Sequence, residues 1–92
     1  MQKPRRDLDI ADTAPLSNEV TAYDKQHLNT YLRLLDADAD GAGWQEVARL
    51  VLHIDPDLER DRARQVWETH LERARWMAAH GYRRLLRGDA PN

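Results

Sequence analysis

Arginine is the residue type in this chain with the clearest capacity for recognition. Arg60, Arg62 and Arg64 recur at alternate positions at the start of a long predicted helix. A planar guanidinium makes two-point contacts with guanine edges and with phosphates, so this spacing is compatible with DNA binding. The same stretch carries Glu59 and Asp61, and more carboxylates follow. They favour a solvated, salt-bridged face that would repel phosphates. The sequence leaves both interpretations open.

No group of residues in the sequence is typical of an active site or a cofactor site. Cysteines are absent, and the histidines lack the HxxxH spacing of a metal-binding helix: His27, His53, His70 and His80. His70 falls on an apolar stripe, where a hydrogen-bonded core histidine is expected. The acidic run 36–43 resembles the start of a calcium loop, but Val47 stands where the loop needs a glutamate. The sequence therefore predicts no enzyme, no cofactor and no metal.

The composition is that of a small helical protein with segregated charge. Its 92 residues form at most one domain, and a formal net charge of −2 argues against strong non-specific nucleic-acid binding. From Arg73 to Arg87, however, five arginines occur without a carboxylate, which is compatible with one basic surface. No apolar run reaches the ~20 residues of a membrane span and no signal peptide is recognisable, so the expected location is the cytoplasm.

Helices are the elements expected to position these residues. The predicted fold class is all-α, a small bundle of about four helices with a helix-turn-helix variant. Thr21 and Asp24 resemble a capping box that would open the first helix. The predicted helices cover residues 22–37, 44–53, 58 or 61 to 79, and one or two further turns within 82–87.

The ends of the chain are expected to lie outside the folded domain. The first twenty residues show no sustained period and contain two prolines, so 1–20 are predicted to be a flexible tail. A second short tail is expected over 89–92, which leaves 21–88 as the domain. Apolar spacing of i, i+3, i+4 and i+7 defines its expected core: Leu28, Tyr31, Leu32, Leu35, Trp44, Val47, Ala48, Val51, Val66, Trp67, His70, Ala74 and Met77.

The segment from Trp44 to Met77 is predicted to be a short helix, a tight turn around Pro56 and a longer helix. In DNA readers of this arrangement, the N-terminal residues of the second helix touch base edges. Trp76 points away from the apolar stripe of that helix. It is expected either to be covered by residues 82–86 or to be exposed for a partner, because tryptophan and arginine are frequent in interface hot spots.

Two stretches carry a resemblance to a known family. GWQEVARLVLHIDPD and RARQVWETHLERARWMAAHGYRRLLRG resemble a proteobacterial helix-turn-helix-variant domain found in regulators of integrative and conjugative elements. The resemblance covers residues 23–88, and the short stand-alone form is similar to the QseM-like antiactivators. It implies repression of element excision and transfer by binding transcriptional activators. The implied partners are the LuxR-class quorum-sensing activator TraR and the fusion activator FseA.

Two main hypotheses follow. In the leading one, the chain is an antiactivator whose expected protein-contact residues are Arg62, Arg73, Trp76, Tyr82, Leu85 and Leu86. In the alternative, it is a helix-turn-helix regulator that contacts DNA directly through Arg60, Arg62 and Arg64. A third and weaker option is a structural subunit that acts through homodimerisation alone.

Overall fold

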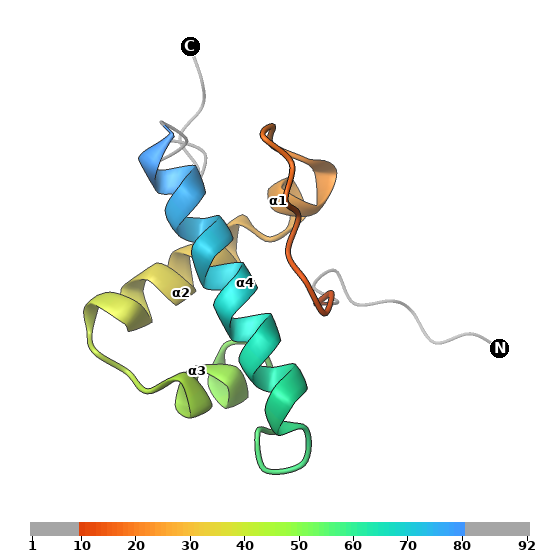
Figure 1. Cartoon of the computed structure of the whole chain (residues 1–92). Helices are drawn as coiled ribbons and strands as arrows, with labels where there is room; N and C mark the ends of the chain where they lie inside the picture. The colour runs from red at the N-terminus through yellow and green to blue at the C-terminus, as the bar shows by residue number, and fades with distance from the viewer. Residues whose placement is uncertain (1–9, 81–92) are drawn as a thin grey trace, which may run out of the picture.

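The computed structural model describes residues 10–80, and within this part of the chain every regular element is a helix (Figure 1). The helices are α1 (Ala22–Gln26), α2 (Leu28–Ala39), α3 (Trp44–Leu50) and α4 (Arg60–Ala79). The predicted all-α class is therefore confirmed. The predicted turns within 82–87 and the tail over 89–92 lie outside the described residues, as do Tyr82, Leu85 and Leu86.

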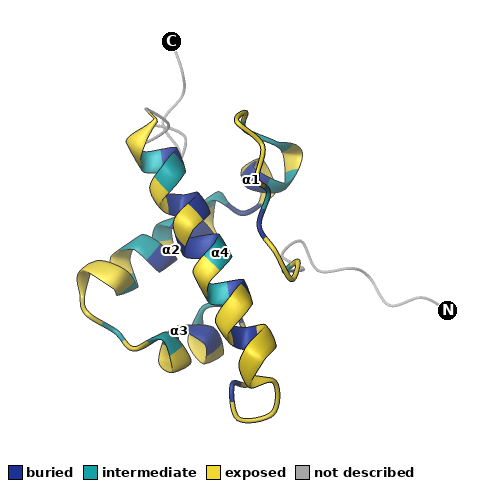
Figure 2. Cartoon of the chain, in the orientation of Figure 1, coloured by how far each residue is buried: buried dark blue, intermediate teal, exposed yellow. Residues whose placement is uncertain are grey.

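The longest helix, α4, organises the fold. Both α2 and α3 pack against it, while residues 10–20 and α1 lie along its other side (Figure 1). The side of α4 toward the other helices is buried and its outer side is exposed (Figure 2). This division follows from the 3.6-residue period of the apolar positions along α4. None of the described helices is long and apolar enough to cross a membrane.

The first predicted helix is divided into two at His27. Thr21 forms the predicted capping box with Asp24, which opens α1. At His27 the backbone leaves helical geometry, with φ −118° and ψ 23°, and its N–H bonds to the carbonyl of Asp24 at 3.1 Å. The ring Nδ1 donates to the carbonyl of Tyr23 at 2.8 Å, the acceptor that a continuous helix would give to the backbone. The local side-chain bond therefore takes the place of one helical bond.

The helix ends also differ from the sequence prediction. Helix α2 continues to Ala39 despite its acidic last turn, and the chain reverses at Gly41, which has φ +78°. Helix α3 ends at Leu50 rather than at residue 53, and His53 has φ +61°. Residues 51–59 connect α3 to α4, so the tight turn predicted around Pro56 is in fact a longer loop. The arrangement is that of a helix-turn-helix variant with an extended connection.

The buried face of α2 is turned by one position from the predicted one. Tyr31 and Leu34 are buried, whereas Leu32 is half-buried. This rotation of α2 about its axis is explained by a polar pair, because the Tyr31 hydroxyl donates to the buried carboxylate of Asp24 at 2.7 Å. Apolar spacing could not reveal that a polar pair fixes the rotation of this helix.

Most other predicted core positions lie in or against the core. The fully buried ones are Val47, Ala48, Val66, His70, Ala74 and Met77. Those that pack against the core while partly exposed are Leu28, Leu35, Trp44, Val51 and Trp67. Buried apolar residues missing from the predicted core list are Ala14, Leu34, Leu52, Ile54, Ala63 and Leu71.

Residues 10–20 differ from the flexible tail predicted for 1–20. Ala14 is buried, and its N–H donates to the Thr69 hydroxyl at 3.2 Å. Ile10 and Val20 pack against the core at the two ends of this segment. The segment is ordered by contacts with residues of α4 that follow more than fifty positions later in the sequence. A local periodic pattern cannot indicate contacts between residues so far apart. Residues 1–9 lie outside the described part of the chain.

Candidate functional site

The start of α4 brings together two of the three arginines considered for DNA binding. Arg60 and Arg64 both lie over the indole of Trp44, with guanidinium carbons 5.6 and 5.1 Å from the ring centroid. Arg64 also lies 5.2 Å from the centroid of Trp67. We call these four residues the arginine–tryptophan face. It is formed where α3 meets the first two turns of α4.

Arg62 lies on another flank of α4, apart from the arginine–tryptophan face. Its Nε donates to Asp12 at 2.8 Å and its Nη1 to Glu59 at 3.0 Å. These two hydrogen bonds raise the pKa of the Arg62 guanidinium, Asp12 first and Glu59 second. Next to them, the Gln65 amide donates to the Thr13 hydroxyl at 2.7 Å. Residues 12 and 13 therefore cover the edge of α4 on which Arg62 lies.

Carboxylates occupy the outward face of α4. Asp61, Glu68 and Glu72 are exposed and spaced by seven and four positions, which places them on one side of the helix. Of residues 10–80, thirteen are Asp or Glu and eight are Lys or Arg. The part of the chain that the structure describes is therefore acidic, although its α4 carries several arginines.

Arg73, expected from the sequence to lie on a protein-contact surface, is inside the molecule. Its side chain is 5 % exposed, and its guanidinium forms a two-point contact with the carboxylate of Asp24, at 3.0 and 2.7 Å. It also donates to the backbone carbonyls of Ser17 and Glu19. Arg73 thus joins the N-terminal segment and α1 to α4, which makes it a structural residue.

The pairing sets the ionisation of the groups around it. Burial alone would raise the pKa of Asp24, but hydrogen bonds from Arg73, the Thr21 backbone and Tyr31 outweigh it and lower the pKa to about 2. Burial, and then the bond to Asp24, raise the pKa of the Tyr31 hydroxyl. The ion pair is therefore maintained at neutral pH. The sequence identified Asp24 only as a member of the capping box, and it predicted neither the burial of Asp24 nor its pairing with Arg73.

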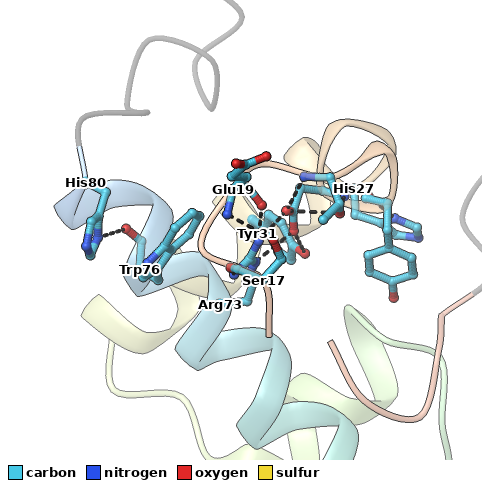
Figure 3. Close-up of polar contacts among 10 residues, drawn as sticks. Ser17, Glu19, His27, Tyr31, Arg73, Trp76 and His80 are labelled. Atoms are coloured by element: carbon cyan, nitrogen blue, oxygen red, sulfur yellow. Dashed lines mark hydrogen bonds and ion pairs between the residues drawn. The ribbon is translucent and has the colours of Figure 1, made fainter. Parts of the chain in front are cut away.

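Trp76 is half-buried beside the Arg73 pair. Its ring centroid lies 4.0 Å from the Arg73 guanidinium carbon and 4.9 Å from the His80 ring centroid, with His80 stacked at 29° (Figure 3). The His80 Nδ1 donates to the carbonyl of Trp76 at 2.8 Å. Trp76 therefore packs against both a cation and an imidazole.

His70 is buried with both ring nitrogens hydrogen-bonded. Its Nδ1 donates to the carbonyl of Val66 at 2.8 Å, so in the neutral ring Nε2 accepts from the Tyr23 hydroxyl at 2.6 Å. Burial lowers the pKa of His70, which keeps the ring neutral. No group of three or more acidic or histidine side chains in the described residues is arranged to hold a metal ion. This histidine is a core residue.

Comparisons with known proteins place the chain in a family. No curated protein matches it. A family model does match, and its description is that of a DNA-binding domain of a transcription factor, which is not an enzyme class. That match spans residues 1–87, so the chain belongs to the RovC_DNA-bd family, described as "T6SS, Transcription factor, DNA binding domain".

Proposed function

We propose that this chain binds duplex DNA as part of a transcription regulator, through the unit formed by α3 and α4. The observation that carries the proposal is the family match over residues 1–87. The position of Arg60 and Arg64 supports it, because they lie in the first turns of the longer helix. Those turns touch base edges in helix-turn-helix readers.

Fluorescence anisotropy with a labelled duplex of random sequence, across a salt series, tests this proposal. Arg60→Ala is expected to weaken binding and to reduce the slope of log K against log salt by about 0.9, the value of one lost phosphate contact. Arg33→Ala is the matched control, because Arg33 is an exposed arginine on α2, a helix that contributes no residue to the arginine–tryptophan face. Undetectable binding at low salt and micromolar protein would overturn the proposal.

A second candidate is an antiactivator that binds a LuxR-class activator such as TraR, or the fusion activator FseA. The acidic balance of residues 10–80 favours it, because a surface rich in carboxylates repels phosphates. Most described arginines are already paired with carboxylates: Arg49, Arg62, Arg64, Arg73 and Arg75. Charge that is compensated within the protein contributes less to binding DNA.

Trp76 is the residue that we propose as the apolar anchor of such a protein contact. Co-purification with a tagged LuxR-class activator tests it with Trp76→Ala and with the control Leu58→Ala, which removes an exposed apolar side chain just before α4. The antiactivator hypothesis expects loss of the complex only for Trp76→Ala, with both variants folded by circular dichroism. If both variants co-purify with the activator as well as the unmodified chain does, Trp76 is not part of the contact surface. If the unmodified chain itself forms no complex, the antiactivator function is ruled out.

A further inference from the structure

We propose that Arg64 reads a guanine base and that Trp44, Trp67 and Glu68 hold its guanidinium in the orientation for that contact. This inference rests on the proposed DNA-binding function. It assigns a specificity-determining residue, three positioning residues and a ligand edge, the N7 and O6 acceptors of guanine in the major groove.

The Arg64 guanidinium is restrained from three directions. Its carbon lies 5.1 Å from the Trp44 centroid and 5.2 Å from the Trp67 centroid, and the two ring centroids are 6.3 Å apart. Its Nε donates to the Glu68 carboxylate, one helical turn along α4, at 2.8 Å. An arginine fixed in this way loses less rotational freedom on binding than one that is free in solvent.

The restraint leaves the recognition edge of Arg64 available. Only Nε is used by Glu68, and in the part of the chain that the structure describes neither terminal nitrogen of Arg64 makes a hydrogen bond. The side chain is 48 % exposed, so it belongs to the surface of the protein. A pair of terminal nitrogens matches two adjacent acceptors, and guanine presents N7 and O6 in that arrangement.

Charge favours guanine over a phosphate as the acceptor. The Glu68 carboxylate compensates the Arg64 charge and would itself be repelled by a phosphate. Hydrogen bonds to a neutral base edge do not depend on a net positive charge. The carboxylate that argues against phosphate binding therefore becomes the group that orients a base contact.

The two neighbouring arginines lack this combination. Arg60 lies over Trp44 alone and makes no ion pair with another described residue. Arg62 already uses Nε for Asp12 and Nη1 for Glu59, so its two-point edge is occupied. Arg64 is therefore the best oriented and most available of the three for a two-point contact with a base.

Selection from a pool of random-sequence DNA duplexes tests the inference. The unmodified chain is expected to enrich a motif with one position restricted to guanine, and Arg64→Ala to lose that restriction while the rest of the motif remains. At that position the preference for guanine should fall by about 5- to 150-fold, the range for one two-point contact. The slope of log K against log salt should stay unchanged, because no phosphate contact is lost.

Variants of Glu68 separate a positioning role from simple repulsion. Glu68→Ala should weaken the preference at the same position, and Glu68→Gln, which still offers an oxygen to Nε, should retain most of it. Glu72→Ala is the matched control, because it removes an exposed carboxylate from the same side of α4. An equal rise in affinity for Glu68→Ala and Glu72→Ala, without change of motif, would show that Glu68 is only a repelling charge.

Two further results would overturn the inference in distinguishable ways. If Arg64→Ala enriches the same motif with its guanine, Arg64 does not read the base, although DNA binding stands. If Arg64→Ala lowers the slope of log K against log salt by about 0.9 and leaves the motif unchanged, Arg64 contacts a phosphate instead of a base. If the unmodified chain enriches no sequence, sequence-specific DNA binding itself fails.

Discussion

Replacing Asp24 by alanine should destabilise the fold more than any surface substitution. Asp24 is fully buried and accepts hydrogen bonds from Arg73, Tyr31 and the backbone of Thr21. Its removal leaves the Arg73 guanidinium inside the protein with only the backbone carbonyls of Ser17 and Glu19 as hydrogen-bond acceptors. The expected effect is therefore the cost of an uncompensated buried charge together with the loss of the α1 cap.

The magnitude follows from these contacts. Breaking a buried ion pair by removing one partner costs about 3–5 kcal/mol. A chain of this length has a free energy of unfolding of about 5–14 kcal/mol, so the substitution removes a large fraction of it. For a domain of this size, the midpoint of thermal unfolding should fall by more than about 12 °C.

The pH dependence supplies a second measurement of the same pair. The pKa of Asp24 is lowered from 3.8 to about 2 in the folded state, so its contribution is fully present above pH about 4. As pH falls from there through about 2, the unfolded chain takes up the proton first. The free energy of unfolding then decreases by about 2 kcal/mol. This decrease should be missing in Asp24→Ala.

Urea denaturation followed by circular dichroism, at pH 7 and between pH 4 and pH 2, measures both effects. Asp36→Ala is the matched control, because it removes an exposed carboxylate from α2. A loss below about 1 kcal/mol for Asp24→Ala, or an unchanged acid dependence, would refute the reasoning. The double variant Asp24→Leu with Arg73→Met should recover much of the stability, because it leaves no unpaired buried charge.

Three further predictions concern other parts of the chain. Asp12→Ala should leave Arg62 paired with Glu59 alone and increase the salt slope of DNA binding, measured by anisotropy, by up to about 0.9, whereas Asp36→Ala should leave the slope unchanged. An unchanged slope for Asp12→Ala would mean that Arg62 reaches no phosphate. Burial lowers the pKa of His70 below 6.5. The contribution of the neutral His70 ring to the free energy of unfolding is therefore fully present above pH 6.5 and decreases as the pH falls below that value. NMR titration of the ring checks the pKa, and a value above 6.5 would contradict this. Gly41→Ala should lower the free energy of unfolding, measured by urea denaturation, by about 1–2 kcal/mol. The cause is backbone strain alone, because φ is +78° and no atom lies within 4 Å of the added carbon. An unchanged free energy of unfolding would mean that the turn rearranges.

The sequence by itself determined the features that depend on near neighbours. The capping box of Thr21 and Asp24 closes within three positions, and the long α4 follows from apolar residues spaced three and four apart. The end of α2 was approached less closely, because the helix continues to Ala39, two residues beyond the predicted end, before the chain reverses at Gly41. The sequence also identified Arg60 and Arg64 as candidates for recognition, because residue type and position in a helix are visible without a fold.

Tertiary structure alone decided that Asp24 and Arg73 are buried and which face of α2 packs inward. Arg73 and Asp24 are separated by 49 positions, so no periodic pattern relates them. Because of this pairing, Arg73 is a buried structural residue and not the surface residue that the sequence predicted. The same pair binds residues 17 and 19 to α4 and contributes to ordering a segment that looks unstructured on local grounds. The interpretation of Glu68 also depends on the tertiary structure. In the sequence it is only a negative charge on the helix, whereas in the structure it accepts a hydrogen bond from Arg64.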